Sequence, residues 1–403
     1  MKKLVNIDPE AIEEVLARGV DTVIGLDHLR ERMLAGECLR IKFGIDPTSP
    51  HMHLGHTVPL RKLRQFQDLG HQAVLIIGDA TAMIGDPTGR SEERKKITKE
   101  EVGENQKTYI EQASKIIDID ATEIHHNGEW FIPMTGQEFL GLTSLVTFQQ
   151  VMQRDDFKKR IDDPEHPLSV LEITYPIMQG YDSVMVKSDV EIGGADQLLN
   201  LHMGRRLQRR FDQHEQDLLT VPLLEGTDGV RKMSKSFGNA IPLESAPEDM
   251  FGLVMTISDD MIVRYFTLLT DCSMEEVQSE EHALQEGKNP RDSKANLAWN
   301  LVRMYHGIDA ANDARGSFDS RFRDGDMPEI ISEFRSVSSS MSIVDVMVAT
   351  QAASSKGEAR RLIEQGGVKL AGSVIIDPDV VVYPRKEEAI LQKGKRFFIK
   401  LLP

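Results

Sequence analysis

The segment from Leu39 to Ile77 limits the possible folds of this chain more than any other stretch. An apolar run at 39–45 leads into a turn at Asp46, and a helical pattern then continues to Gly70. A second run, 73–77, is apolar throughout and is typical of a buried parallel strand. Strand, helix and strand in this order predict a right-handed βαβ unit with any ligand at the carboxyl ends of the strands. We therefore predict an α/β fold with a Rossmann-like parallel sheet.

The motif at 53–56, His-Leu-Gly-His, stands where the first predicted strand passes into the helix. His53 and His56 are three residues apart and share one face of the first helical turn. Unpaired N–H groups and the positive dipole end of a helix favour a phosphate there, and Gly55 allows a ligand to approach the backbone. Taken alone, the motif is equally compatible with two ordinary polar residues at a helix start.

A second motif, Lys-Met-Ser-Lys-Ser at 232–236, lies far downstream among glycines. It predicts a loop that carries the two ammonium groups of Lys232 and Lys235. In isolation, a solvated charged loop is the better interpretation of this segment.

Arg90 and Arg94 lie at the end of a glycine-rich turn. For these two arginines, a contact with a phosphate and a position on a solvated face are equally good interpretations.

The later part of the chain repeats the strand-to-helix pattern. Apolar runs at 184–186, 190–192 and 218–224 predict three more strands. Gly194 and Asp196 mark a second junction between a strand and a helix, with a glycine for close approach and an aspartate near the cap.

Tyr175, Gln179 and Asp182 are spaced four and three residues apart, so they share one face of a predicted helix. Burying these polar groups is costly unless each finds a partner. They are therefore candidates for binding a polar ligand.

The distribution of charge separates the C-terminal segment from the rest. The net charge is −16, but residues 343–403 contain ten Lys/Arg and seven Asp/Glu, so the remainder carries −19. This asymmetry is expected if only the C-terminal part holds RNA. No apolar stretch approaches a membrane span, no signal peptide is evident, and Cys38 and Cys272 suggest neither a disulfide framework nor a metal site.

We predict three domains. The first spans 1–240 and corresponds to the catalytic domain of the enzyme family that the motifs resemble. Its mostly helical stretch at about 97–172 fits the connecting insertion of that family, which makes a dimer contact in some members, although its apolar stretch at 139–152 could equally form core. A helical domain spans 241–335, a serine-rich linker lies at 324–342, and a small α+β RNA-binding domain spans 343–403.

The two motifs together resemble the paired signature of the class I aminoacyl-tRNA synthetases. FGIDPT, IGDPTGR, YxxxQGYD and GGADQ occur with them in the order found in the bacterial tyrosyl-tRNA synthetases, in the subgroup that carries KMSKS. The C-terminal segment is similar to the RNA-binding domain named after a small-subunit ribosomal protein, so the resemblance covers essentially the whole chain. One alternative is a tryptophanyl-type synthetase, which normally lacks the terminal domain and YxxxQGYD. The other alternative is a non-catalytic RNA-binding relative. The intact histidines of the first motif and the intact lysines of the second motif argue against it.

The resemblance implies that L-tyrosine and ATP form tyrosyl-adenylate and pyrophosphate, and that tyrosyl then passes to the 3′-terminal adenosine of tRNA(Tyr). It also implies Mg²⁺ with ATP, no tightly bound cofactor, a homodimer, and a cytoplasmic location without a membrane. The implied catalytic residues are His53, His56, Lys232, Lys235, Arg90 and Arg94. The implied ATP-binding residues are Gly44, Asp46, Thr48, His53, Gly55, His56, Gly194, Asp196 and Lys235. The implied tyrosine-binding residues are Lys42, Thr81, Asp86, Tyr175, Gln179, Asp182 and Gln197. The implied tRNA-binding residues are Arg360, Arg361, Lys369, Lys393, Lys395 and Arg396, and no metal ligands are implied.

One position departs from the pattern of many family members. They carry tyrosine at the position of Lys42, where it contacts the hydroxyl of the substrate. Lysine at this position leaves Asp182 as the evident partner of that hydroxyl and leaves its second partner open.

Overall fold

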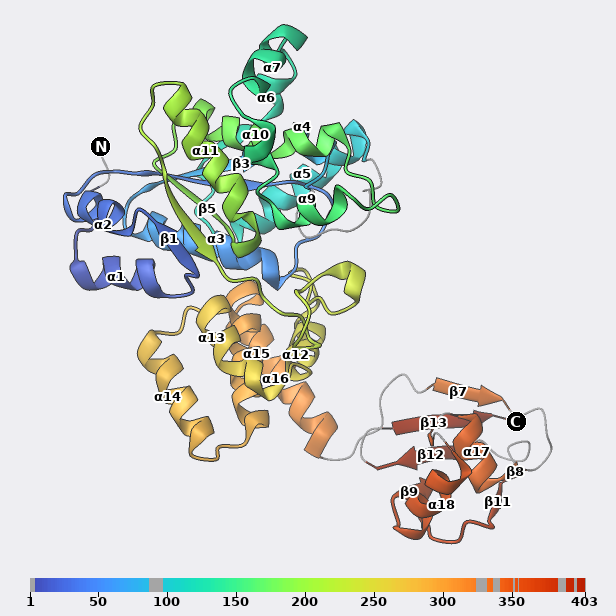
Figure 1. The fold of residues 1–403 in the computed structure, drawn as a ribbon. Helices are drawn as coiled ribbons and strands as arrows, with labels where there is room; N and C mark the ends of the chain where they lie inside the picture. The colour runs from blue at the N-terminus through green and yellow to red at the C-terminus, as the bar shows by residue number, and fades with distance from the viewer. Residues whose placement is uncertain are drawn as a thin grey trace. The chain divides into compact units, whose positions relative to one another are not determined.

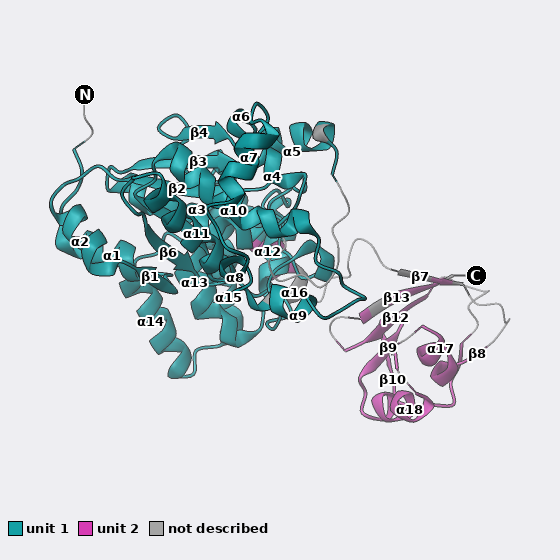
Figure 2. Ribbon diagram, turned by 45° about the horizontal axis from the view of Figure 1, so that its top comes forward, with its two compact units in different colours: residues 1–314 teal, residues 315–403 magenta. Residues whose placement is uncertain are grey.

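The fold comes from a computed structural model that describes residues 4–86, 97–323, 332–335, 341–350, 352–353, 355–382, 389–394 and 397–402. The chain forms two compact units, residues 1–314 and 315–403 (Figure 2). Among the described helices, none is long and apolar enough to cross a membrane.

A six-stranded sheet forms the centre of the first unit (Figure 1). Its strands are β1 (Thr22–Ile24), β2 (Arg40–Ile45), β3 (Gln72–Ile77), β4 (Glu123–His126), β5 (Val190–Gly194) and β6 (Asp217–Val221). The spatial order is β1-β6-β5-β2-β3-β4, and every neighbouring pair is parallel except β1 with β6. The five parallel strands have the Rossmann order, which reverses between β2 and β5. Ligands bind in the crevice that forms beyond the carboxyl ends of the strands at such a reversal.

Helices cover both faces of this sheet. The described helices between residues 4 and 210 are α1 (Pro9–Ala17), α2 (Leu26–Leu34), α3 (Leu54–Asp68), α4 (Asp79–Ala82), α5 (Lys99–Ser114), α6 (Gly128–Phe131), α7 (Gly136–Thr143), α8 (Phe148–Val151), α9 (Asp155–Arg160), α10 (Val170–Val186) and α11 (Leu198–Arg210). Lys42 of β2 is in register with Glu191 of β5, and both side chains hydrogen-bond to Ser183 of α10. α10 therefore packs on the face of the sheet to which Lys42 and Glu191 point, and α3 contacts β2, β3, β5 and β6.

Four predicted strands are confirmed as β2, β3, β5 and β6. The strand predicted at 184–186 is wrong, because these residues form the last turn of α10. Lys187 ends that helix in the left-handed conformation, with φ of 50°. A short apolar triplet has no visible period, so it cannot distinguish a strand from a buried helix end. The short strands β1 and β4 have no clear signal in the sequence.

A group of five helices completes the first unit, and its last helix runs into the second (gold to orange in Figure 1). These helices are α12 (Pro247–Met255), α13 (Ile262–Leu269), α14 (Met274–Gln285), α15 (Pro290–His306) and α16 (Ile308–Arg323). The helical character predicted for the domain at 241–335 is wrong at its end, because Ser332–Arg335 is strand β7. The rest of the predicted linker, apart from Met341 and Ser342, lies outside the described residues.

The second unit combines two helices with short strands. The five-stranded sheet has the order β10-β9-β12-β13-β7, and β8 pairs separately with β11. The elements are β7, β8 (Met341–Ser342), α17 (Ile343–Ala349), α18 (Lys356–Glu364), β9 (Val368–Leu370), β10 (Ser373–Ile375), β11 (Val381–Val382), β12 (Ala389–Lys393) and β13 (Phe397–Leu402). Its core contains Ile343, Met347, Ile363 and Leu391, so this unit buries an apolar cluster of its own.

Gly180 lies where α10 crosses α11. A Cβ atom there would approach the carbonyl carbon of Met203 to 2.9 Å and the backbone nitrogen of Gly204 to 3.0 Å. Gly180→Ala should therefore reduce the free energy of unfolding by about 1–3 kcal/mol, because the two helices must separate. The control is Gly252→Ala in α12, where nothing lies within 4 Å of the added Cβ and helix propensity favours alanine by about 0.5–1 kcal/mol. Urea denaturation measures both variants, and equal stability of the two would contradict the close helix crossing.

Candidate active site

A cavity of about 370 Å³ lies at the carboxyl ends of β2 and β5, where the strand order reverses. Every predicted ATP-binding residue except Lys235 lines it, and so does every predicted tyrosine-binding residue except Lys42. Lys232 also reaches it. Its walls include residues that the sequence analysis did not select, namely Phe43, Ile45, Pro59, Ile76, Gly78, Ile192, Gly193, Val221, Pro222, Leu223, Leu224, Met233 and Ser234. The size is in the range of small-molecule sites.

The first turn of α3 borders the cavity with two histidines. The Nδ1 of His53 accepts a hydrogen bond from the backbone N–H of Gly55 (3.2 Å). The Nδ1 of His56 accepts one from the backbone N–H of His53 (3.1 Å). Because both Nδ1 atoms act as acceptors, each neutral ring carries its proton on Nε2 and can donate that proton to an anion.

Both imidazoles are held in the neutral form. Burial lowers the pKa of His53 to about 2, and the neighbouring His56 and Lys235 contribute in the same direction. Burial also lowers the pKa of His56 to about 4, with Lys235 as a smaller cause. The histidines therefore offer a phosphate hydrogen bonds at a helix N-terminus without contributing a charge of their own.

Asp46 follows β2 and connects two other predicted site residues. Its Oδ2 accepts a hydrogen bond from the hydroxyl of Tyr175 (2.8 Å), and its Oδ1 accepts one from Thr81 Oγ1 (2.8 Å). A Cβ atom at Gly78 would lie 2.0 Å from Asp46 Oδ1 and 2.3 Å from Thr81 Oγ1, so any larger residue there would displace this hydrogen-bonded pair. Burial, helped by the charges of Asp46 and Asp86, raises the pKa of Tyr175 well above its usual value, so its hydroxyl stays a donor.

Asp182 is a buried carboxylate in the cavity wall, with 4% of the residue exposed. Its Oδ1 accepts a hydrogen bond from the indole N–H of Trp130 (2.9 Å), and its Oδ2 accepts one from Asn127 Nδ2 (3.4 Å). Burial raises the pKa of Asp182 to about 7, against the opposing effects of Lys42 and the two donors. Asn127 and Trp130 are absent from the predicted site residues. Asn127 directly follows β4, at the ligand-binding edge of the sheet, and because β4 has no clear signal in the sequence, nothing there marks Asn127 as a site residue.

A chain of side-chain hydrogen bonds fixes another part of the cavity wall. Arg154 Nη1 donates to Asn200 Oδ1 (2.8 Å), and Asn200 Nδ2 donates to Gln197 Oε1 (2.8 Å). Gln197 Nε2 in turn donates to Asp86 Oδ2 (2.7 Å). The buried guanidinium of Arg154 thereby sets the orientation of the Gln197 amide, which presents its N–H group to Asp86.

The two lysines of the 232–236 motif have different partners. Lys232 Nζ lies 3.5 Å from Asp196 Oδ2, at the cavity. Lys235 Nζ donates to Ser49 Oγ (2.9 Å) and to the carbonyl oxygen of His51 (2.6 Å), in the loop between β2 and α3. Burial lowers the pKa of Lys235.

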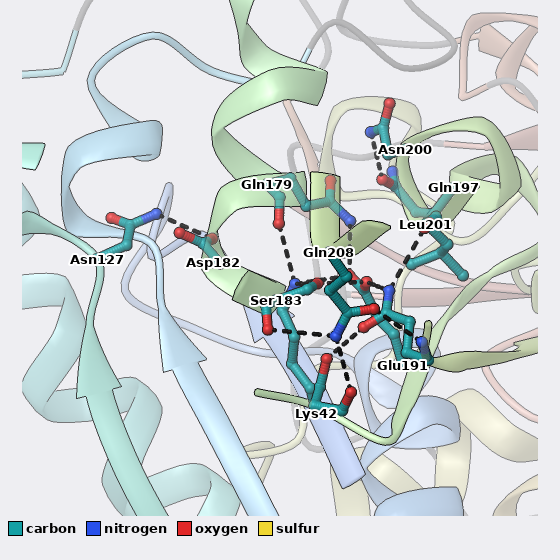
Figure 3. A network of polar contacts seen from close by, with 12 residues as sticks. Lys42, Asn127, Gln179, Asp182, Ser183, Glu191, Gln197, Asn200, Leu201 and Gln208 are labelled. Carbon is teal, nitrogen blue, oxygen red and sulfur yellow. Dashed lines mark hydrogen bonds and ion pairs between the residues drawn. The ribbon is translucent and has the colours of Figure 1, made fainter. Parts of the chain in front are cut away.

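Lys42 lies behind the cavity in a network of polar contacts (Figure 3). It is fully buried, and its Nζ forms an ion pair with Glu191 Oε1 at 2.8 Å. The resemblance implies a contact with substrate at this position, but the residues that line the cavity do not include Lys42.

The other predicted site residues lie elsewhere. Arg90, Arg94, Lys395 and Arg396 are outside the described residues. Arg360 and Arg361 are exposed on α18, Lys369 is exposed on β9, and Lys393 ends β12. Within the described ranges, no group of three or more His, Cys, Asp and Glu side chains could hold a metal ion.

Two family models match the chain. The model of the tRNA synthetases class I (W and Y) matches residues 35–323, and that of the Tyrosine--tRNA ligase SYY-like C-terminal domain matches residues 323–401. The chain is 46% identical over 394 residues to a protein of Thermotoga maritima named Tyrosine--tRNA ligase, covering 98% of each chain. It is 43% identical to a Tyrosine--tRNA ligase of Bordetella avium, covering 97% of this chain and 96% of the relative.

Solved structures share the fold. A C-terminally truncated mitochondrial tyrosyl-tRNA synthetase of Aspergillus nidulans superposes with a TM-score of 0.65 at 23% identity, covering 78% of this chain and 94% of that one. The tyrosyl-tRNA synthetase of Archaeoglobus fulgidus, complexed with L-tyrosine, gives a TM-score of 0.62 at 19% identity and covers 77% and 100%. At these identities the likeness establishes the α/β architecture.

The geometry at the start of α3 predicts how the two histidines titrate. Both rings should stay in the neutral Nε2–H form from pH 8 down to about pH 5, because burial lowers both pKa values. Heteronuclear NMR of histidine-labelled protein measures this directly, with His53→Asn and His56→Asn providing the assignment. A midpoint near 6.5 for either ring, the value of an unperturbed histidine, would contradict the described hydrogen bonds.

Proposed function

The chain belongs to the tyrosine--tRNA ligases of the class I tRNA synthetase family, and we propose how its own residues divide the work of that ligase. The observation that carries the proposal is the meeting of two groups in one cavity. The neutral histidines of α3 suit phosphate oxygens, and the buried carboxylate of Asp182 suits a hydroxyl donor. Tyrosyl-adenylate carries both kinds of group, a phenol hydroxyl at its tyrosine end and a phosphate between its tyrosine and adenosine parts.

We propose that the tyrosine carboxylate attacks the α-phosphate of ATP in line and that pyrophosphate leaves. The attacking group is already ionised, so the step depends on positioning and on stabilising charge. His53 and His56 donate their Nε2–H groups to phosphate oxygens. Lys232, beside Asp196, offers an ammonium to the negative charge that develops on the leaving group.

The remaining cavity residues position the substrates in this proposal. Tyr175, Gln179 and Asp86 hold the tyrosine ammonium, while Asp196 and Gln197 hold the ribose and the carboxyl group. Gly44, Thr48, Gly55 and Gly194 border the nucleotide, and Lys235, Arg90 and Arg94 gather on the departing pyrophosphate. Thr81 acts through Asp46, to which it donates a hydrogen bond.

We propose that Mg²⁺ enters with ATP and is held mainly by phosphate oxygens, because this ion keeps several waters and rarely uses an all-protein cage. It would neutralise phosphate charge during the attack. No tightly bound cofactor is needed for this chemistry.

The proposed arrangement assigns the later transfer to tRNA(Tyr) to more than one part of the chain. Residues 1–240 carry activation, while 241–335 and 343–403 contact the tRNA. In this proposal, the exposed cationic side chains on α18 and β9 contact phosphates of the tRNA backbone. The proposed site of action is the cytoplasm.

A homodimer through the segment from α6 to α10 is part of the same proposal. Its apolar side chains divide into two groups. Leu142 and Val151 are buried in a core cluster, whereas Leu140 and Phe148 are exposed. Further exposed apolar side chains of this segment are Ile132, Ile161, Val170 and Leu171. A second copy of the chain would remove these groups from water.

Substrate choice tests the proposed activity. Asp182→Ala should reduce kcat/KM for tyrosine by about 10- to 100-fold, because a hydrogen bond to a charged group contributes about 1.5–3 kcal/mol. Activity with phenylalanine should change far less, so the preference for tyrosine should collapse. Tyrosine- and phenylalanine-dependent ATP–pyrophosphate exchange measures both, with Asp182→Asn as the uncharged variant of similar shape. An unchanged preference in both variants would remove Asp182 from the recognition of the hydroxyl.

The same carboxylate should give a pH signature. The titratable and charged groups around Asp182 include Lys42 of β2, Glu191 of β5 and Tyr175 of α10. Since burial raises the pKa of Asp182 to about 7, kcat/KM for tyrosine should fall as the pH decreases through that value and the acceptor gains a proton. Phenylalanine has no hydroxyl, so its kcat/KM should lack this decrease towards acidic pH, which is the acid limb of the pH profile.

The exposed cations of α18 should act on tRNA and not on adenylate formation. Arg360→Ala/Arg361→Ala should leave tyrosine-dependent pyrophosphate exchange intact and weaken tRNA binding. Each lost phosphate contact should reduce the slope of log affinity against log salt by about 1. Filter binding at several salt concentrations measures the slope, and equal losses in both activities would contradict the assignment.

A further inference from the structure

The ammonium of Lys42 has no N–H left for a substrate. An ammonium has three donors. They go to Glu191 Oε1 (2.8 Å), to Ser183 Oγ (2.8 Å) and to the backbone carbonyl oxygen of Gln179 (3.0 Å). An ammonium also cannot accept a hydrogen bond. With the residue fully buried behind the cavity, a direct contact with a ligand is not available to it.

Glu191 is equally well satisfied. Its Oε1 accepts from Lys42 and from Gln179 Nε2 (3.3 Å), and its Oε2 accepts from Ser183 Oγ (2.9 Å) and from Gln216 Nε2. Lys42 and Glu191 face each other in register on neighbouring strands, at the point where the strand order reverses. The ion pair therefore joins the two strands on either side of the crevice.

Both partners of this pair hold α10 on its ligand-binding side. Ser183 is the chain neighbour of Asp182, and Gln179 lines the cavity one helical turn earlier. The hydrogen bond from Gln179 Nε2 to Glu191 also fixes the orientation of the Gln179 side-chain amide. Because Nε2 binds Glu191, the amide oxygen Oε1 is the atom that does not. An acceptor at that atom is suited to the ammonium of an amino acid.

We propose that Lys42 and Glu191 form a positioning pair that fixes Gln179 and Asp182 in the amino-acid half of the cavity and so determines the preference for tyrosine without touching it. This inference rests on the proposal that Asp182 binds the hydroxyl group of the substrate tyrosine. The charge of Lys42 also favours the ionised form of Asp182, in which the carboxylate accepts the hydroxyl. Glu191 acts in the opposite direction as a smaller influence, so removing both charges together should still favour protonation of Asp182.

The test replaces the pair and leaves the cavity wall unchanged. Lys42→Met/Glu191→Gln removes both charges. The new amide can still accept from Gln179 and donate to Ser183, while its nitrogen then faces Gln216 Nε2 and loses that bond. Lys62→Met is the matched control. Lys62 is a second buried lysine, and within the part of the chain that the structure describes its Nζ donates to the backbone carbonyl oxygens of Val15 and Arg18, both at 2.6 Å.

Pyrophosphate exchange with tyrosine and with phenylalanine, measured across pH together with thermal unfolding, gives the readout. In the double variant we expect KM for tyrosine to rise about tenfold and the acid limb of kcat/KM to move up by about one pH unit, since a nearby opposite charge has an effect of this order. KM for ATP should stay within about twofold, because the histidine end of the cavity is not joined to the pair. The control should lose thermal stability and keep wild-type values for all three quantities.

Wild-type tyrosine KM, acid limb and tyrosine preference in a folded double variant would overturn the proposal and leave the pair with a purely structural role. If the double variant does not fold, Ser183→Ala answers the same question, because it removes the contacts of the pair with the residue next to Asp182 and keeps both charges. That variant should raise KM for tyrosine several-fold, and an unchanged value would overturn the proposal. Failure of the proposed function is separate, since it would appear as an undiminished preference for tyrosine in Asp182→Ala.

Discussion

The reversal of strand order between β2 and β5 is the constraint on which the site depends. The connections that leave these neighbouring strands turn to opposite sides, so a crevice opens at their carboxyl ends. The turn after β2 supplies Asp46 and leads to α3, and the end of β5 supplies Gly194 and leads to Asp196. Directly below, the buried pair Lys42–Glu191 joins the same two strands.

Burial affects the titratable groups of the crevice in two opposite ways, and both suit the ligase. Desolvation keeps His53 and His56 uncharged, so they act as hydrogen-bond donors at a helix terminus. The same effect raises the pKa of Asp182 to about 7, where the balance between its two forms is sensitive to neighbours. A lysine that never reaches the ligand can therefore influence which amino acid binds.

The sequence predicts the parts of the site that depend on local pattern. The βαβ unit, the histidines at the start of α3 and the shared helix face of Tyr175, Gln179 and Asp182 follow from spacing, and the structure brings these side chains to one cavity. The contacts of Lys42 could not be predicted, because its partners Glu191 and Ser183 are distant in sequence and meet it only in the folded sheet. The role of Trp130 could not be predicted for the same reason, since its indole contacts Asp182 from a separate helix.

The central claim is that the cavity binds the adenylate with its phosphate at α3 and its phenol at Asp182. A crystal structure with a non-hydrolysable tyrosyl-adenylate analogue tests it most directly. The account predicts a phenolic oxygen within about 3 Å of an Asp182 carboxylate oxygen and phosphate oxygens at similar distances from His53 or His56 Nε2. It also predicts that Lys42 Nζ keeps its bonds to Glu191 and Ser183. A phenol bound to Lys42, or a phosphate distant from both histidines, would contradict the account.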